Sequence, residues 1–148
     1  MAEQVRIIVV NWNGRAFLEE CLQSIRAQTY RSFSVVLVDN GSTDGSLMLV
    51  RNRFPEVQVN PLPENRGFAA ANNCALRGLQ APYAALINND AVAEPGWLGN
   101  LVEALEQTKE AGFAASKMLY YHQPDVIDRC GDGYTRAGVG LLRGRGEP

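Results

Sequence analysis

The sequence has few of the residues on which disulfide frameworks and structural zinc sites depend. Its 148 residues include three cysteines (Cys21, Cys74 and Cys130), no Cys-x-x-Cys pair, and a single histidine, His122. An odd number of widely separated cysteines argues against a disulfide framework, and the lack of paired ligands argues against structural zinc. We therefore expect a protein of a reducing compartment, the cytoplasm.

Long apolar runs and a strong net charge are also missing. No apolar stretch approaches the ~18–20 residues that cross a bilayer, and the polar first four residues do not resemble a secretion signal. The 14 basic and 16 acidic residues give a net charge of −2, which argues against a nucleic-acid binder that acts by charge neutralisation. The glycine signatures of P-loop and Rossmann dinucleotide sites are absent. With 46% hydrophobic residues, the chain can bury the core of one domain, residues 1–148.

Short β-branched runs alternate with amphipathic segments, which predicts an α/β fold with a parallel sheet and right-handed crossovers. The expected strands are residues 5–10, 33–38, 57–59, 83–87 (interpreted as buried) and 113–118. Four helices are expected between them, with these apolar faces: Phe17, Leu18, Cys21, Leu22 and Ile25; Leu47, Val50 and Phe54; Phe68, Ala71, Asn72, Ala75, Leu76 and Leu79; and Trp97, Leu98, Leu101, Val102 and Leu105.

The chain after this α/β core of residues 1–118 has a different character. Residues 131–148 contain six glycines, and no convincing strand or helix period is present there. We interpret Asp125, Asp128 and Asp132 as part of a solvated loop rather than a metal site, and His122 as exposed rather than as a catalytic base. Residues 119–148 are expected to be a glycine-rich loop or β segment of a longer enzyme domain.

Three polar loops follow expected strands, at residues 11–14, 39–46 and 88–90. Ligands of parallel α/β sheets bind at the carboxyl ends of the strands, so these loops are the candidate site. Asp39 either accepts hydrogen bonds from a base or ribose, or stabilises the turn that follows it. Asp90 either holds Mg²⁺ or Mn²⁺, or belongs to an ordinary turn.

Two further features leave similar alternatives. Arg66 and Gly67 precede an expected helix whose free N–H groups suit a phosphate, although an ordinary helix start explains them as well. Trp12 is either a core aromatic or a platform on which a base stacks. These alternatives stay open on residue type and spacing alone.

Four segments together resemble family 2 glycosyltransferases of the GT-A fold, and most resemble the bacterial rhamnosyltransferase-like members. They are residues 9–14 (VVNWNG), 37–46 (LVDNGSTDGS), 65–72 (NRGFAAAN) and 86–90 (LINND), in the order and at about the spacing of that family. The resemblance implies a nucleotide-sugar site whose donor-binding residues are Asn11, Trp12, Asp39, Asn65, Arg66, Gly67 and Asn89.

The same resemblance implies roles for these residues. Asp39 matches the aspartate that binds the uracil or thymine ring, and Asp90 matches the last carboxylate of the DxD motif, which binds Mg²⁺ or Mn²⁺. Asn88 stands where that motif has its first aspartate. The metal bridges diphosphate oxygens and stabilises the charge that develops on the leaving group. No segment matches the acidic general base of the family, which lies later in its domain.

The implied activity is transfer of a sugar from a UDP- or dTDP-linked donor, with rhamnose as one candidate, to a glycan or lipid-linked acceptor. The resemblance also implies inversion at the sugar, a role in cell-envelope polysaccharide synthesis and peripheral membrane association at the cytoplasmic face. The alternative is a non-catalytic nucleotide-sugar-binding module, since the base is missing. A nucleotidyltransferase is disfavoured, because the loop at residues 11–15 is short and poor in glycine.

Overall fold

The computed structural model describes residues 3–148, which form two compact units. The first unit ends at Leu98, and the second runs from Gly99 to Pro148. Helix α4 (Trp97–Gln107) begins at the end of the first unit and continues into the second. In the described part of the chain, no helix combines the length and the hydrophobicity needed to cross a bilayer.

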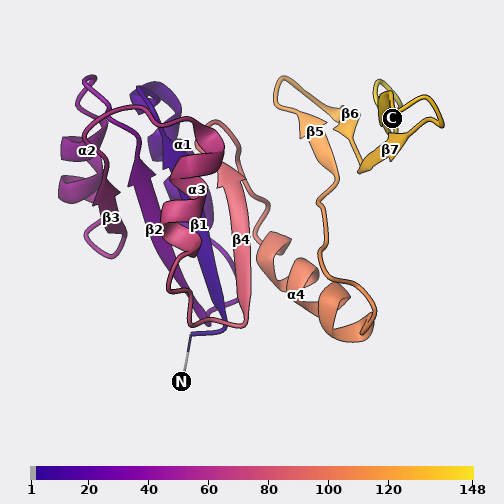
Figure 1. Ribbon diagram of the computed structural model, residues 1–148, viewed down its shortest axis with the longest axis horizontal. Coiled ribbons are helices and arrows are strands. Elements are labelled where there is room, and N and C mark those ends of the chain that lie inside the picture. Colours follow the sequence, from indigo (N-terminus) through magenta and orange to yellow (C-terminus); the bar gives the residue numbers. More distant parts are fainter. Residues whose placement is uncertain (1–2) are drawn as a thin grey trace. The chain divides into compact units, whose positions relative to one another are not determined.

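The first unit contains a four-stranded parallel sheet. Its strands are β1 (Val5–Asn11), β2 (Phe33–Asp39), β3 (Gln58–Pro61) and β4 (Tyr83–Asn88), in the order β3-β2-β1-β4. The chain moves outward from β1 to β3 and then crosses back to β4, so β3 and β4 form opposite edges (Figure 1). The strand order therefore reverses between β1 and β4, which is where ligands bind in sheets of this kind.

Helices cover both faces of the sheet. Helix α3 (Phe68–Leu76) packs its small residues Ala71 and Ala75 against Ile8 and Val36 on one face. The intervening strand residues point to the opposite face. There Leu22 and Ile25 of α1 (Arg15–Arg26) border a small hollow together with Val35, and α2 (Ser46–Arg53) contacts α1. The β-branched strands are thus buried on both sides, as expected for a parallel sheet.

Three expectations about burial in this unit are wrong. Strand β4 is not buried: its side chains alternate between half-buried and exposed, and Leu86 is 50% exposed. The reason is its place at the sheet edge, because α3 contacts β1 and β2. Phe17 and Phe68 are each 58% exposed. Leu18 takes the inward position next to Phe17, and Phe68 is the first residue of α3, one turn before the buried Ala71.

The second unit contains two antiparallel hairpins. Strand β5 (Met118–Tyr120) pairs with β6 (Gln123–Arg129), and β7 (Asp132–Tyr134) pairs with β8 (Gly140–Leu142). The parallel fifth strand expected at residues 113–118 is therefore wrong, because only its last residue is in a strand. The loop expected around Asp125 and Asp128 is wrong as well, because both lie in β6.

Residues 119–148 were expected to be a glycine-rich loop or β segment, and the strands after residue 131 are ones that no periodic pattern had indicated. Left-handed Gly138 (φ 78°) lies in the turn between β7 and β8, and left-handed Gly131 (φ 101°) lies in the link between the two hairpins. Strands of three residues are too short to show a period. Asp128 forms ion pairs with Arg129 and Arg145, at 3.5 and 3.9 Å. His122 is exposed and lies edge-on to Tyr121, with ring centroids 5.0 Å apart.

Candidate functional site

Strand register brings the predicted loops to one level at the carboxyl edge of the sheet. Asn11 lies opposite Asp39 across β1 and β2, and Val10 lies opposite Asn88 across β1 and β4. Each loop leaves its strand at this level. The structure therefore places the polar residues that follow β1, β2 and β4 next to one another.

A buried amide, Asn11, lies at the centre of this edge. Its side chain is fully buried, and its Nδ2 group donates hydrogen bonds to Asp39 Oδ1 and Ser42 Oγ, both at 3.0 Å. Its Oδ1 atom accepts a hydrogen bond from Asn89 Nδ2 at 2.8 Å. One side chain thus contacts the residues that follow β2 and the residue that follows β4.

Asp39 stabilises its own turn. Its Oδ2 atom accepts a hydrogen bond from the Ser42 backbone N–H at 3.0 Å, and its side chain is 1% exposed. Asp39 therefore stabilises the turn that follows it, which is one of the two roles that the sequence left open. Each carboxylate oxygen has two lone pairs, so these bonds leave acceptor capacity for another donor.

A second amide, Asn40, attaches the loop that precedes α3. Its Nδ2 group donates to Asn65 Oδ1 at 2.8 Å, and its Oδ1 atom accepts from the Arg66 backbone N–H at 2.8 Å. Asn65 Oδ1 also accepts from the Gly67 N–H at 2.9 Å. The Arg66 side chain remains exposed, beside the start of α3. The structure thus brings the expected residues 65–67 to the same edge as Asp39.

Gly41 is required between these two loops. A Cβ atom at this position would lie 2.8 Å from the backbone of Glu64, and φ is +78°. Crowding and a left-handed backbone therefore both exclude a side chain there.

The loop after β1 and the loop after β2 are joined by hydrogen bonds from backbone N–H groups to side chains. The Asn13 N–H donates to Ser42 Oγ at 2.9 Å, and Asn13 Oδ1 accepts from the Thr43 N–H at 2.8 Å. Asp44 accepts hydrogen bonds from Ser46 and from the Arg15 N–H. Partial burial opposes ionisation of Asp44, but these hydrogen bonds outweigh it, and the pKa of Asp44 is lowered.

Gly14 makes room for the contact between Asn11 and Asn89. A Cβ atom at Gly14 would lie 1.9 Å from Asn89 Nδ2 and 2.7 Å from Asn11 Oδ1. The φ angle of Gly14 is −103°, which any residue adopts. Space, rather than backbone conformation, therefore requires glycine at this position.

Two other predicted residues point outward at this edge. Trp12 is 57% exposed, so it is not a core aromatic. Asp90 is exposed, and within residues 3–148 its carboxylate accepts no hydrogen bond and forms no ion pair. No group of three or more acidic, His or Cys side chains suited to a metal occurs in the described residues. Asp90 is thus a single carboxylate with free coordination capacity.

A buried thiol supports the strand end that carries Asp90. Cys21 Sγ donates to the carbonyl oxygen of Asn88, at 3.4 Å. Burial, with a smaller contribution from the negative charge of Asp90, raises the pKa of Cys21 to about 12. This cysteine is therefore an uncharged packing residue and not a nucleophile.

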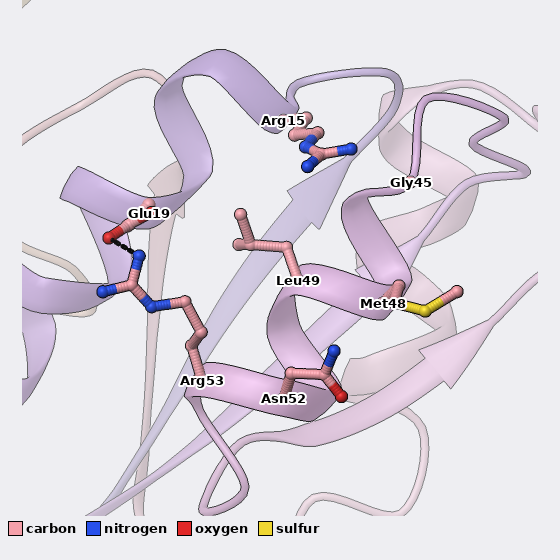
Figure 2. Close-up of a pocket in the computed structure, with 7 residues that line it drawn as sticks. All are labelled: Arg15, Glu19, Gly45, Met48, Leu49, Asn52 and Arg53. Carbon is pink, nitrogen blue, oxygen red and sulfur yellow. Dashed lines mark ion pairs between the residues drawn. The ribbon is translucent and has the colours of Figure 1, made fainter.

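A separate hollow of about 550 Å³ lies between α1 and α2. Figure 2 shows Leu49 between Arg15 and the ion pair of Arg53 with Glu19. None of the expected donor-binding residues lines it. We therefore place the candidate site at the carboxyl edge of the sheet and not in this hollow.

Comparison with known proteins identifies the family. Residues 6–136 match the family described as Glycosyl transferase family 2. The chain belongs to this family. The resemblance carried by the four sequence segments is thereby confirmed, and so is the GT-A type of α/β fold.

Relatives of this glycosyltransferase chain come from several prokaryotes. It is 27% identical over 132 residues to the glycosyltransferase GlyG of Streptococcus pneumoniae, covering 84% of this chain and 42% of GlyG. It is 28% identical over 123 residues to the N-acetylglucosaminyl-diphospho-decaprenol L-rhamnosyltransferase of Mycobacterium tuberculosis, covering 76% and 40%.

A solved structure is also similar. The mannosyltransferase PcManGT from Pyrobaculum calidifontis, in complex with GDP-Man and Mn²⁺, superposes with a TM-score of 0.71 at 29% identity, covering 80% of this chain and 36% of PcManGT. The chain spans less than half the length of each of these three relatives.

Sequence reasoning missed the residues that connect the loops of the candidate site. Ser42, Asn40 and Asn13 were part of turn signatures and not of the expected site. The signal was the density of Asn, Ser and Asp in residues 39–46, since short polar side chains hydrogen-bond nearby backbone groups. Their partners lie on other loops, so spacing along the chain could not show them.

Proposed function

We propose that this chain is the donor-binding part of a glycosyltransferase that transfers a sugar from a nucleoside diphosphate sugar to a glycan or lipid-linked acceptor. Membership of family 2 supports the reaction class. The single observation that carries the proposal is the convergence of Asp39, Arg66 and Asp90 at the carboxyl edge of one parallel sheet. These groups offer a ring acceptor, a cation and a metal ligand to one nucleotide.

The roles of the protein groups follow from their chemistry. Asp39 accepts a hydrogen bond from a ring N–H of the nucleobase, and the exposed Trp12 supplies a flat apolar surface beside it. Arg66 and the first N–H groups of α3 offer positive charge to the diphosphate. These groups hold the leaving nucleotide in place while the sugar departs.

The residues at the end of β4 fit a divalent metal. Mg²⁺ is commonly bound by one or two carboxylates together with phosphate oxygens and water, and Asp90 supplies one exposed carboxylate that has no partner among residues 3–148. When bound, Mg²⁺ or Mn²⁺ neutralises charge on the diphosphate leaving group. The Mn²⁺ complex of PcManGT supports this assignment.

The finer features rest on the relatives and on the sequence. UDP, dTDP and GDP sugars are the donors to test, because the sequence resemblance implies the first two and PcManGT was solved with GDP-Man. The mycobacterial rhamnosyltransferase supports rhamnose as a candidate sugar. Inversion at the sugar, an acceptor of the cell envelope and a place at the cytoplasmic face of the membrane complete the proposal.

Calorimetric titration of UDP, dTDP and GDP into the purified chain, with and without Mn²⁺, tests the proposal. We expect one diphosphate to bind, and Mn²⁺ to increase its affinity. An absence of binding for all three, in both conditions, would contradict a donor site in this chain.

A non-catalytic nucleotide-sugar-binding module is the second candidate. It is favoured by Asn88, which stands in place of a carboxylate at the end of β4, and by the absence of a general-base motif. Both candidates bind the donor, so binding does not separate them. Sugar transfer to any acceptor by this chain would exclude the second candidate.

A further inference from the structure

The proposed nucleobase acceptor and the proposed metal ligand follow different strands of this sheet. Asp39 ends β2, and Asp90 follows β4, with β1 between them. The two carboxylates must nevertheless be held in register to receive one nucleotide, since a misplacement of about 1 Å is costly in such sites. The structure contains a hydrogen-bonded connection from Asp39 to Asn89, the residue that precedes Asp90.

The connection is a chain of three side chains. Asn89 Nδ2 donates to Asn11 Oδ1 at 2.8 Å, and Asn11 Nδ2 donates to Asp39 Oδ1 at 3.0 Å. The middle residue has no exposed surface, so it reaches a ligand only through its neighbours. Both of its polar atoms are used, one toward each strand. The carboxamide orientation is therefore fixed from both sides.

We infer that Asn11 and Asn89 are positioning residues that couple the nucleobase acceptor Asp39 to the loop that carries Asp90. This inference rests on the proposed function, and it replaces the donor contacts expected for these two residues by an indirect role. Asn89 holds the Asn11 carboxamide so that its N–H group, and not its oxygen, faces Asp39. If Asn11 turned over, its oxygen would face the carboxylate and repel it.

The packing around Asn89 favours its hydrogen bond with Asn11. Gly14 leaves no room for a Cβ atom beside Asn89, so the loop after β1 approaches this half-buried amide closely on one side. The Asn11 side chain also holds Ser42, whose hydroxyl accepts from the Asn13 N–H. A displacement of Asn89 is thus expected to reach Asp39 and the nucleobase loop together.

The test measures nucleotide binding without metal, so that any effect of Asn89 on the metal does not enter. UDP, dTDP and GDP are titrated into the parent chain in EDTA and followed by NMR, and the diphosphate that binds most tightly becomes the probe. We expect Asn89→Ala to weaken its binding roughly 3- to 10-fold, which corresponds to about 0.6–1.4 kcal/mol. Asn89→Asp, which keeps the size but turns the donor into an acceptor, should weaken it at least as much.

The decisive step repeats Asn89→Ala in an Asp39→Asn background. If Asn89 acts through Asp39, its effect on affinity should disappear there, which a general loss of stability would not produce. Asn73→Ala, at an exposed asparagine of α3, is the matched control and should leave affinity unchanged. Tryptophan fluorescence checks that each variant is folded. If Asn89→Ala does not fold, the same comparison is made with Asn89→Asp.

The outcomes separate the two proposals. Unchanged metal-free affinity in folded Asn89 variants, or an equal loss with and without Asp39, overturns the coupling and leaves the proposed function in place. An absence of binding by the parent chain to all three diphosphates, in EDTA and with Mn²⁺ alike, overturns the proposed function, and the coupling with it.

Discussion

The space at Gly14 gives a sharp test of how the site is packed. In Gly14→Ala, the new methyl group would lie 1.9 Å from Asn89 Nδ2 and 2.7 Å from Asn11 Oδ1, so the Asn89 side chain must leave its place. Overpacking of this kind costs about 1–3 kcal/mol. Loss of the hydrogen bond between the two asparagines adds about 0.5–1.5 kcal/mol. We therefore expect the free energy of unfolding to fall by roughly 2–4 kcal/mol.

Urea unfolding followed by tryptophan fluorescence measures this change. The two tryptophans of the chain, Trp12 and Trp97, both lie in the first unit, so the signal reports the unit that contains Gly14. Gly78→Ala is the control for backbone strain without crowding, because Gly78 has φ +76° and a methyl group added there would meet no atom of the described residues within 4 Å. The cost of this control substitution is conformational alone, about 1–2 kcal/mol.

A double variant tests whether crowding against Asn89 causes the loss of stability in Gly14→Ala. In an Asn89→Ala background, the nearest atom to the new methyl is gone, so Gly14→Ala should become less destabilising, while the cost of Gly78→Ala should not change. A loss at Gly14 below about 0.5 kcal/mol, the range of neutral surface substitutions, would refute the reasoning. So would a loss at Gly14 that Asn89→Ala does not reduce.

Four further predictions concern the same edge of the sheet. Asp39→Ala should weaken nucleotide binding by roughly 1.5–3 kcal/mol, the value of a hydrogen bond to a charged acceptor, and equal affinity in calorimetry would contradict the base-binding role. Asp90→Ala should keep the fold and abolish the increase in affinity produced by Mn²⁺, so a persistent Mn²⁺ effect would exclude Asp90 as the ligand. The pKa of Asp44 is lowered in the folded protein, so its ionised form stabilises the fold above its unfolded pKa of about 3.9, and this contribution is lost as the pH falls through the folded-state pKa. Asp44→Asn should therefore flatten the acid side of a plot of unfolding free energy against pH, and an unchanged slope would contradict this role of Asp44. Cys21, buried and with its pKa raised to about 12, should resist alkylation at pH 8 in the native protein while Cys74 and Cys130 react, and mass spectrometry of the labelled peptides measures the difference.

The parallel core could be predicted because each of its elements carries its own signal. The strand ending at Asp39 is found within a residue of its expected bounds, and the expected helix before it buries Leu18, Cys21, Leu22 and Ile25. Apolar periodicity and turn residues act locally, so the sequence displays them. The edge position of β4 was not visible, because burial of a strand depends on which helix covers it.

The site was predictable in its position but not in its contacts. Strand ends place Asp39 and Asp90 at one edge once the sheet is known to be parallel. The link between them runs through Asn11 and Asn89, which are 78 residues apart, and neither type of side chain indicates a partner at that distance. The hairpins after residue 118 escaped detection for a different reason, since three-residue strands carry almost no periodic pattern.

The central place of Asn11 has a consequence for the order in which the chain acquires its structure. Its Nδ2 group donates to Asp39, 28 residues later in the chain, whereas its Oδ1 atom accepts from Asn89, 78 residues later. A growing chain that has completed β2 but not β4 therefore leaves this acceptor without its donor, and contacts of such long range form slowly. This edge of the sheet is therefore complete only when β4 pairs with β1, after Asn11 and Asp39 have already been synthesised.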